Sequence, residues 1–471
     1  MVFSVVPGGA GQFAPDARLA RQLGKAGPRY ACYPSAERFS AEFGYRDYLQ
    51  AVAGLRTRGS ARALSLYLHI PFCEAACHHC ACHKVSAKGR DKAATYLSYL
   101  KREIEMQGRL FGGMNQLEQL HLGGGDPSYL SDAQLGELMQ HTRRWFQFAP
   151  DLLGEYSIDL DPRGLTPKRI DSLRQQGFNR ISLGLHDDDP GVERALNRMP
   201  GSGATEAAIG AARAAGFRSV GVKLLYGLPQ QTPDSMAHTL ARLVAAGPDR
   251  ILLAPYVHRP LQFKAQRLLD ASALPGPELN AELLALCSGQ LLEAGYLQIG
   301  MGQFARPGDE LAVAQRQGRL RWNFQGYSGH AGADLVACGL AAVSAVGATY
   351  CQNVRTLDAY YELLDRNELP IARGLRLDMD DLLRRTLIQT LLCHFELSVS
   401  AIEQAFPIVF ASYFGPELEC LRECELAGLL SIGADFISVS PKGRKQIRAL
   451  CMVFDRYLAC APSAATRSKA S

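Results

Sequence analysis

The sequence predicts an α/β fold in which parallel strands alternate with outer helices, followed by a smaller, α-rich C-terminal domain. Between about residues 64 and 257, six short apolar runs alternate with amphipathic stretches of helical length. After about residue 260 this alternation stops, and residues 370–462 have a mostly helical pattern. Such alternation is typical of parallel βα units, but periodicity alone does not distinguish an open doubly wound sheet from a partial barrel.

The apolar runs are the predicted strands. They lie at residues 64–70, 117–122, 156–160, 180–185, 219–225 and 250–256, with helices predicted between them at 96–110, 131–146, 166–176 and 232–246. Three helices begin with a hydroxyl residue that can cap free backbone N–H groups, namely Ser131, Thr166 and Thr232. Proline, which is favoured at the first helical position, follows two of them directly.

The chain divides into five predicted segments. Residues 1–60 form an N-terminal arm, and residues 61–265 form the parallel βα array. Residues 266–369 form a connecting region that we expect to complete the functional site. Residues 370–462 form the C-terminal helical domain, with a short hairpin between its helices, and residues 463–471 form a tail that we expect to be disordered.

Composition and charge exclude several classes of protein. The chain has 471 residues, of which 47% are hydrophobic and 21% charged, as in ordinary globular proteins. Its formal net charge of +5 suits a small anionic substrate, but the basic residues are too dispersed for a nucleic-acid-binding surface. No apolar run reaches the roughly 18 residues that span a bilayer, and no secretory leader pattern is present. We therefore expect a cytoplasmic protein.

Four of the thirteen cysteines lie close together in the sequence. Nine are dispersed, and we expect most of them to be free, buried thiols, because the cytoplasm keeps cysteines reduced. The others are Cys73, Cys77, Cys80 and Cys82, in a loop that follows the first predicted strand. Three thiolates spaced by three and two residues can hold one iron–sulfur cluster.

Zinc is the alternative metal that this loop could bind. A structural zinc site has four ligands, and Cys82 or a neighbouring histidine could supply the fourth. The position favours iron–sulfur, because the loop follows a parallel strand at the carboxyl edge, where such folds place their active sites. A cluster held by three cysteines also leaves one iron without a protein ligand, and that iron is open to a small molecule.

The spacing C-x3-C-x2-C after the first strand resembles the signature of the radical S-adenosylmethionine superfamily. A wider set of motifs is similar to the oxygen-independent coproporphyrinogen III oxidase family and runs from about residue 25 to 460. The set comprises Y-L-H-I-P-F-C at residues 67–73, G-G-G at 123–125, Y-G-L-P at 226–229, R-P at 306–307 through Q-R at 315–316, N-F-Q-G-Y at 323–327 and P-R-Y at 28–30.

The resemblance implies a partial (βα)6 barrel and a particular chemistry. Cys73, Cys77 and Cys80, and not Cys82, would bind a [4Fe–4S] cluster whose free iron chelates S-adenosylmethionine. Cleavage of that molecule yields a 5′-deoxyadenosyl radical, which abstracts hydrogen from propionate side chains. Two oxidative decarboxylations then convert coproporphyrinogen III to protoporphyrinogen IX in haem biosynthesis. The family binds one or two S-adenosylmethionine molecules.

The resemblance also implies which residues contact the cofactor. These are Tyr67, His79, Gly124, Gly125, Asp126, Asp159, His186, Arg198 and Lys223, with Leu225, Val257, Gln325 and Val343 at a second S-adenosylmethionine. Glycines let the backbone approach a ligand, although a plain turn explains them as well. Asp161 suits a turn-capping role, and Arg198 is either a partner for a ligand carboxylate or a solvated helix residue.

Several of these positions depart from the family pattern. The family has threonine at Asp126, glutamate at Asp159, glutamine at His186 and an aromatic residue at His79. An Asp-His pair stands where this chain has Gly302-Gln303. The largest change is Lys223, because the family has aspartate there and the charge is reversed. We expect Lys223 to be able to pair with Asp159 across adjacent strands.

Three interpretations remain open on the sequence. The first is an active, divergent oxidase, with no catalytic residue assigned, in which Arg29, Arg259 and Lys264 are candidates for binding substrate carboxylates. The second is a cluster-binding paralogue with a degenerate cofactor site, which binds haem or a porphyrin or acts on another substrate. The third is a zinc-stabilised binding protein. For the oxidase we expect a monomer that uses a separate electron donor and acceptor and binds neither nucleic acid nor membrane.

Overall fold

The computed structural model describes residues 32–56, 63–74, 77–85, 91–111, 113, 116–198, 203–330 and 332–458. Its centre is a sheet of 13 strands in the order β15-β14-β13-β12-β1-β2-β4-β5-β6-β7-β9-β8, with β3 paired to β2 outside this order. The parallel strands are β12 (Asp334–Cys338), β1 (Leu64–Ile70), β2 (Gln116–Gly124), β3 (Gln147–Phe148), β4 (Glu155–Leu160), β5 (Arg180–His186), β6 (Ser219–Tyr226) and β7 (Arg250–Pro255).

The six predicted strands are confirmed, and strands that the sequence did not reveal extend the sheet at both edges. Beside β12 lie the antiparallel strands β13 (Val343–Val346), β14 (Thr349–Asn353) and β15 (Ile371–Arg376). Beside β7 lie β9 (Gln303–Ala305) and β8 (Leu297–Gly300). β15 falls within the segment that the sequence grouped with the C-terminal domain, but it pairs with β14 in the large sheet.

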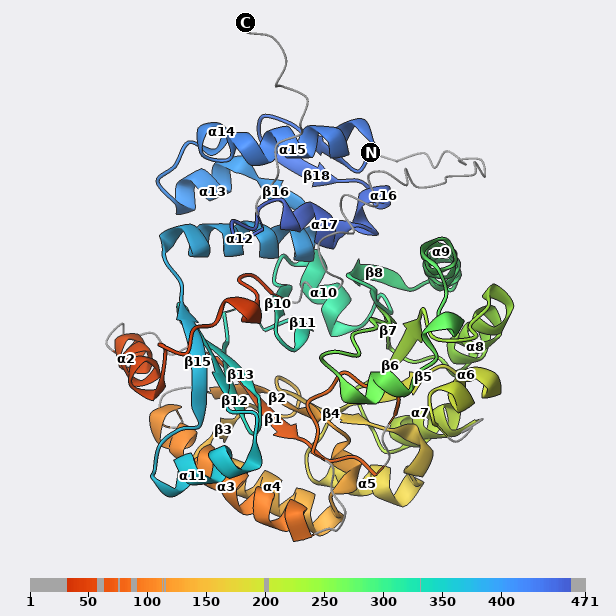
Figure 1. Cartoon of the computed structure of the whole chain (residues 1–471), viewed down its shortest axis with the longest axis vertical. Coiled ribbons are helices and arrows are strands. Elements are labelled where there is room, and N and C mark those ends of the chain that lie inside the picture. The colour runs from red at the N-terminus through yellow and green to blue at the C-terminus, as the bar shows by residue number, and fades with distance from the viewer. Residues whose placement is uncertain are drawn as a thin grey trace, which may run out of the picture.

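Helices cover the outer face of the parallel strands. They are α3 (Asp91–Phe111), α4 (Asp132–Trp145), α5 (Pro167–Gln175), α6 (Pro190–Ala195), α7 (Ala204–Ala214), α8 (Pro233–Ala246) and α9 (Pro277–Glu293). Figure 1 shows most of them following one another in an arc around the strands, so the sheet forms a partial barrel. The predicted caps are confirmed, because the side chains of Ser131, Thr166 and Thr232 each accept a backbone hydrogen bond from the first turn.

Alternate residues of each strand face the helices or the interior of the barrel. In β1 the leucines Leu64, Leu66 and Leu68 are fully buried in the outer core, and each such burial stabilises the fold by roughly 2 kcal/mol. The residues between them, such as Ser65 and Tyr67, face the other way. The barrel interior is therefore lined with polar side chains rather than filled with branched apolar ones.

A charged network closes the barrel interior at the amino ends of the strands. Arg250 contacts Asp309 at 2.9 Å and Glu155 at 3.3 Å, and Arg180 pairs with Glu310. Burial acts to raise the pKa of Glu155, but Arg250 holds that pKa below its usual value. The open end of the barrel is thus the carboxyl end, where the predicted site residues lie.

A buried carboxylate joins α3 to the segments that follow β12 and β14. Glu103 is fully buried and accepts hydrogen bonds from the Gly339 N–H at 2.7 Å, from Asn353 Nδ2 at 2.7 Å and from the Tyr360 hydroxyl. Tyr360 belongs to α11 (Leu357–Asp365). Burial raises the pKa of Glu103 to about 7.

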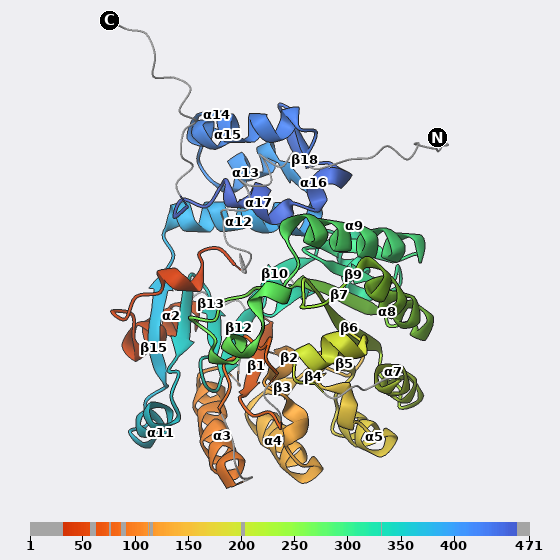
Figure 2. The ribbon, with the colours of Figure 1, turned by 45° about the vertical axis from the view of Figure 1, so that its right-hand side comes forward.

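The C-terminal domain shares a hydrophobic core with β8, β9 and the segment that follows them, and it contains the predicted hairpin. Its helices are α12 (Met379–His394), α13 (Val399–Ala405), α14 (Phe410–Tyr413), α15 (Gly415–Leu426), α16 (Pro441–Arg444) and α17 (Ile447–Met452), and its small sheet comprises β16 (Glu396–Ser398), β18 (Phe436–Val439) and β17 (Leu430–Ile432). Figures 1 and 2 show it beside β8, α10 (Glu310–Arg316) and the hairpin of β10 (Arg321–Asn323) and β11 (Gly326–Ser328).

The arm contributes α2 (Tyr45–Arg56) from its described part, next to β14. Residues 1–31 of the arm and the whole predicted tail, residues 463–471, lie outside the described residues. Within the described residues, no helix is long and apolar enough to span a bilayer.

Candidate active site at the carboxyl edge of the barrel

The cysteine loop, residues 71–85, leaves β1 at the carboxyl edge of the sheet, as predicted. Its two ends are joined, because the Val85 N–H donates to the Pro71 carbonyl at 2.8 Å. Its centre is anchored to the segment after α6, because the His78 N–H donates to the Leu196 carbonyl at 3.0 Å. The loop is therefore held over the mouth of the barrel.

The three predicted cluster ligands surround one lysine. Burial acts to lower the pKa of Lys84, but Cys80, Cys73 and Cys77 raise it, so one ammonium group faces all three thiols. A hydrogen bond from the Cys82 thiol lowers the pKa of Cys80 to about 5, whereas burial raises that of Cys73 to about 12. No three His, Cys, Asp or Glu side chains in the described part of the chain stand at metal-binding separation. Three soft thiols that face one ammonium group suit an anionic iron–sulfur cluster.

Arg198 is buried against the cysteine loop. It donates to Cys77 Sγ at 3.8 Å and to the Gly184 carbonyl at 3.2 Å, and it lies 3.3 Å from Asp161. Its side chain is only 2% exposed, so it is not a solvated helix residue. Its Nε–H is buried and has no hydrogen-bond partner in the structure. An unpaired buried guanidinium N–H can receive an anionic ligand at low cost.

The glycines after β2 pack directly against the start of the cysteine loop. The Gly125 N–H donates to the Ile70 carbonyl at 2.7 Å, and the Asp126 N–H donates to the Phe72 carbonyl at 2.8 Å. A Cβ atom on Gly125 would lie 2.4 Å from the Phe72 carbonyl oxygen. Gly124 has φ +110°, which side chains rarely allow. These glycines are therefore required for the close approach of two backbone segments.

Two of the acidic residues cap local turns. Asp126 accepts from the Ser128 N–H at 3.0 Å, and burial raises its pKa. Asp161 accepts from the Arg163 N–H at 3.1 Å and pairs with the Arg163 guanidinium at 2.6 Å. The capping role that the sequence suggested for Asp161 is confirmed.

His79 and His186 lie together, with ring centroids 4.5 Å apart. Burial lowers the pKa of His79 to about 3 and that of His186 well below its usual value, so both rings are neutral. Nδ1 of each ring is buried and unpaired in the structure. The backbone of His186 has φ 68°, which side-chain-bearing residues rarely adopt and which marks strain at this site.

Asp159 faces the barrel interior beside a histidine that sequence reasoning missed. Its carboxylate lies 3.4 Å from His121 Nε2, and His121 stacks on Tyr67 with centroids 5.7 Å apart. Burial acts to raise the pKa of Asp159, but His121 and, further away, Lys223 lower it. His121 is one of the alternate interior residues of β2, and that alternation was the only signal that could have identified it.

The expected pairing of Lys223 with Asp159 across adjacent strands is wrong. Asp159 is on β4 and Lys223 is on β6, and β5 lies between them. Lys223 forms no ion pair with any residue that the structure describes, and its side chain is exposed toward the open barrel. It acts electrostatically on both His79 and His186, whose pKa values it helps to lower.

Two residues predicted at a second S-adenosylmethionine lie near the end of β6 and just after β7. Leu225 is 7% exposed near the end of β6. Val257 follows β7, and its carbonyl accepts from Gln266 Nε2 at 3.2 Å. The same amide donates to the His79 carbonyl at 3.2 Å, so Val257 is tied to the cysteine loop.

The other two lie beside β1 and on β13. Gln325 lies in the barrel interior, where its Oε1 accepts from the Ser65 hydroxyl at 3.3 Å and its Nε2 is buried and unpaired. Val343 begins β13, opposite Gln352, and packs in a small cluster with aromatic residues of the arm and of β14.

The departure at Gly302-Gln303 lies at the start of β9, which pairs with β7. Gly302 has φ +83°, and a Cβ there would lie 2.1 Å from the Leu253 carbonyl oxygen, so no side chain fits. Gln303 Nε2 donates to the carbonyls of Ile251 at 3.4 Å and Phe304 at 3.1 Å.

A pair of arginines near the cysteine loop was also missed. Arg355 and Arg373 both donate to Gln352 Oε1, at 3.5 and 2.7 Å, and neither has an acidic partner among the described residues. His83 Nε2 lies 2.7 Å from the Arg355 carbonyl, which places the pair beside the loop. The two come from segments that are distant in sequence, so no local pattern identified them.

Of the cations suggested for substrate binding, Arg29 lies outside the described residues. Lys264 is exposed in a 3-10 helix after β7, and Arg259 donates to Gln262 at 3.4 Å. Both follow β7 on the carboxyl side of the sheet. Their role stays a prediction.

A curved parallel sheet with a three-cysteine loop at its carboxyl edge defines a radical S-adenosylmethionine protein. Residues 67–243 match the Radical SAM superfamily, and residues 377–445 match the HemN C-terminal domain. The oxygen-independent coproporphyrinogen III oxidase of Pseudomonas aeruginosa is 44% identical over 94% of this chain and 96% of its own length. That of Synechocystis is 37% identical over 94% and 95%.

A solved structure agrees with these sequence matches. The structure of coproporphyrinogen III oxidase (HemN) from Escherichia coli, described as a radical SAM enzyme, has a TM-score of 0.88 at 42% identity and covers 95% of this chain and 100% of that one. The chain belongs to the oxygen-independent coproporphyrinogen III oxidase family.

Proposed function

We propose that this chain catalyses the oxygen-independent conversion of coproporphyrinogen III to protoporphyrinogen IX. Each of two propionate side chains loses a hydrogen atom, then carbon dioxide and one electron, and becomes a vinyl group. Membership of the family over nearly the whole chain supports this activity. The observation that carries it is Arg198, a buried cation with an unpaired N–H beside the three-cysteine loop.

Cys73, Cys77 and Cys80 would hold a [4Fe–4S] cluster, which together with S-adenosylmethionine supplies the hydrogen-abstracting radical. Arg198 would bind the carboxylate of that molecule through its free N–H. Gly124 would offer backbone groups to its polar end. The neutral imidazole of His79 would pack near its adenine, since histidine can stack.

Other predicted residues would complete the cofactor sites. Tyr67, Gly125, Asp126, Asp159, His186 and Lys223 would line the first, and Leu225, Val257, Gln325 and Val343 the second. The buried unpaired amide of Gln325 supports a ligand in the barrel interior.

Arg355 and Arg373 would bind carboxylates of the porphyrinogen. Two guanidinium groups that share one amide oxygen, and that have no acidic partner in the part of the chain that the structure describes, suit propionate groups. Burial, and then Arg355, lowers the pKa of Arg373, so a carboxylate there would relieve repulsion between the two cations. Arg259 and Lys264 would serve a further propionate.

The reaction would take place in the cytoplasm, in a monomer that exchanges electrons with a separate donor and acceptor.

A cluster-binding paralogue without this activity is the second candidate, and Lys223 favours it. An ammonium group has donors only, so it cannot accept hydrogen bonds from ribose hydroxyls, and it repels a sulfonium ion. In that case the chain would bind haem or a porphyrin, or act on another substrate.

Anaerobic turnover separates the two. The reconstituted protein is incubated with coproporphyrinogen III, S-adenosylmethionine and a reductant, with Cys77→Ala as the matched inactive control. Formation of protoporphyrinogen IX by the unmodified protein alone supports the oxidase. A full iron content without any product supports the paralogue.

A further inference from the structure

A buried glutamine lies within the segment that follows β7, residues 256–268. The segment ends in the 3-10 helix η4 (Lys264–Leu268), whose Arg267 and Leu268 are exposed. Gln266, in the same helix, is fully buried. Burial of an amide is costly unless the amide is hydrogen bonded, so the contacts of Gln266 indicate what it does.

The side-chain amide of Gln266 binds three backbone groups. Its Nε2 donates to the carbonyl of Val257 and to that of His79, both at 3.2 Å. Its Oε1 accepts from the Arg259 N–H at 2.5 Å. Both N–H donors and the oxygen of the amide are therefore in use. Two of the partners lie in the same segment, whereas His79 lies 187 positions earlier, in the cysteine loop.

The contact with His79 holds the turn between two of the predicted cluster ligands. The Cys80 N–H donates to the Cys77 carbonyl at 3.2 Å and closes this turn. The His78 N–H donates to the Leu196 carbonyl at 3.0 Å, and the His79 carbonyl accepts from the buried amide. The turn is thus attached both to the segment after α6 and to the segment after β7.

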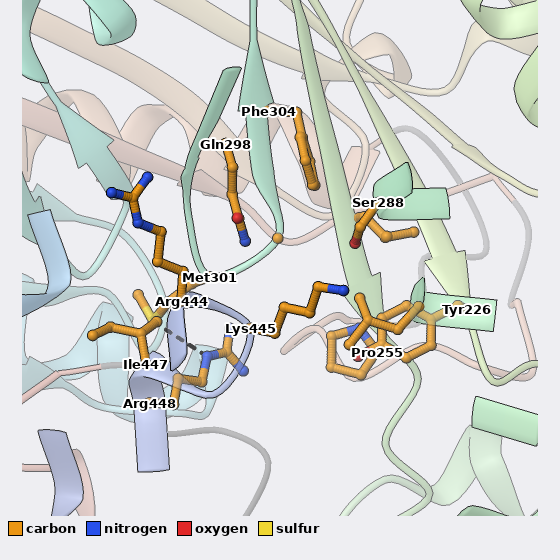
Figure 3. A pocket seen from close by; sticks show the side chains of 13 residues that line it. Tyr226, Pro255, Ser288, Gln298, Met301, Phe304, Arg444, Lys445, Ile447 and Arg448 are labelled. Atoms are coloured by element: carbon orange, nitrogen blue, oxygen red, sulfur yellow. Dashed lines mark hydrogen bonds between the residues drawn. The ribbon is translucent and has the colours of Figure 1, made fainter. Parts of the chain in front are cut away.

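Other contacts fix the segment after β7 itself. β7 ends at Pro255, which lies beside Tyr226 in the wall of a cavity whose other side comes from α16 and α17 (Figure 3). The next residue, Tyr256, donates its N–H to the Tyr226 carbonyl at 2.7 Å. Further on, Arg267 Nε donates to the Pro260 carbonyl at 2.9 Å. Local folding accounts for two of the three hydrogen bonds of the buried amide, but not for the one to the cysteine loop.

We propose that Gln266 is a positioning residue for the binding of S-adenosylmethionine. It holds the turn of the cysteine loop in the place where His79 faces the ligand. The ring of His79 packs against that of His186 with centroids 4.5 Å apart, so a shift of the His79 backbone moves its ring within the cofactor site. A loop that is already ordered loses less conformational entropy when a ligand binds. The inference rests on the proposed function, because it takes S-adenosylmethionine as the ligand.

Calorimetric titration with S-adenosylmethionine, on anaerobically reconstituted protein with its full iron content, is the first test. Gln266→Met keeps the approximate volume of the side chain and removes its amide. Gln262→Met is the matched control, because it makes the same change in the same segment, where the exposed Gln262 amide accepts from the Arg259 side chain at 3.4 Å. We expect Gln266→Met to weaken binding about tenfold, as when one buried acceptor loses its donor, and Gln262→Met to leave binding unchanged.

Hydrogen exchange of the full chain before reconstitution is the second test, and it needs neither cluster nor ligand. In Gln266→Met the amides of His78 and Cys80 should exchange at least fivefold faster than in the unmodified protein. The amides of α3 and α12 should exchange at the same rate in both, which shows that the fold is intact. Faster exchange confined to residues 256–268 would show a purely local role and would overturn the proposal.

The two tests separate this proposal from the proposed function. Equal affinity of Gln266→Met and the unmodified protein for S-adenosylmethionine, or equal weakening by both methionine variants, would also overturn the proposal. Failure of the unmodified protein to bind S-adenosylmethionine would refute the proposed function instead. Exchange at His78 and Cys80 would then still decide whether Gln266 positions the loop.

Discussion

Replacing Gly125 by alanine tests whether the glycine segment after β2 positions the cysteine loop. A Cβ at this position would lie 2.4 Å from the Phe72 carbonyl oxygen and 2.9 Å from the Ile70 carbonyl oxygen. Both contacts are with backbone, so no side-chain rotation relieves them. The chain leading to Cys73 must move away from the glycine segment.

That movement breaks the two backbone hydrogen bonds of 2.7 and 2.8 Å that join the segments. Each contributes about 1 kcal/mol, and groups left unpaired add to the cost, so we expect a local destabilisation of about 2–4 kcal/mol. This corresponds to roughly 30- to 1,000-fold faster hydrogen exchange at the Gly125 and Asp126 amides. The altered loop should also bind less iron after anaerobic reconstitution.

Hydrogen exchange followed by mass spectrometry measures the first effect, and an iron assay measures the second. Gly210→Ala is the matched control, because Gly210 lies within α7 and nothing lies within 4 Å of its added Cβ. That change should leave both readouts unaltered. Exchange and iron content equal to those of the unmodified protein in Gly125→Ala would refute the reasoning.

Three further predictions follow from single side chains. Cys80→Ala should lose iron after reconstitution while Cys82→Ala keeps it, and the opposite result would exchange their roles. Lys223→Asp should bind S-adenosylmethionine more tightly in anaerobic calorimetry. The Lys223 ammonium group and the sulfonium ion, about 6 Å apart at an effective dielectric constant near 20, would repel by nearly 3 kcal/mol, which is about a hundredfold in affinity. Equal or tighter binding by the unmodified protein would show that Lys223 serves another ligand. Glu103, whose pKa burial raises to about 7, favours the folded state in its protonated form, so its contribution is full below about pH 4.5 and is lost as the pH rises through 7. The free energy of unfolding of the unmodified protein should fall by about 3 kcal/mol over this pH range, and that of Glu103→Gln should lack this fall. A difference in unfolding free energy between the two proteins that does not change with pH would contradict the prediction.

The parallel strands and the helix starts could be predicted because each depends on a local pattern. The apolar runs match β1, β2 and β4 to β7 within a few residues, and the hydroxyl caps lie where the helices begin. The place of the cysteine loop followed from the order of β1 and the loop along the chain. The division into five segments remains a prediction.

Strand pairing between distant segments could not be predicted. β12 is a run of five buried residues about 270 positions after β1, yet it lies parallel beside β1. Nothing in the sequence of β12 indicates that it pairs with β1. Arg355 and Arg373 lie beside the cysteine loop only because β14 and β15 continue the sheet from β12.

Two interior residues, His121 and Ser157, were missed for a different reason. The apolar runs predicted strands, but nothing in them marked the polar residues at alternate positions, such as His121 and Ser157, as residues of the site. His121 Nδ1 lies 2.7 Å from the Ser157 hydroxyl, a contact that depends on the register of β2 and β4. The pairing of Lys223 with Asp159 failed because the order of three strands, and not their sequence spacing, determines which residues are neighbours.

The stoichiometry of anaerobic turnover tests the central claim most directly. Conversion of two propionates to two vinyl groups requires two hydrogen abstractions and two decarboxylations. The unmodified protein should form two molecules of 5′-deoxyadenosine and two of carbon dioxide for each protoporphyrinogen IX, and Cys77→Ala should form none. Formation of 5′-deoxyadenosine without loss of carbon dioxide from coproporphyrinogen III, by a protein with its full iron content, would contradict the account.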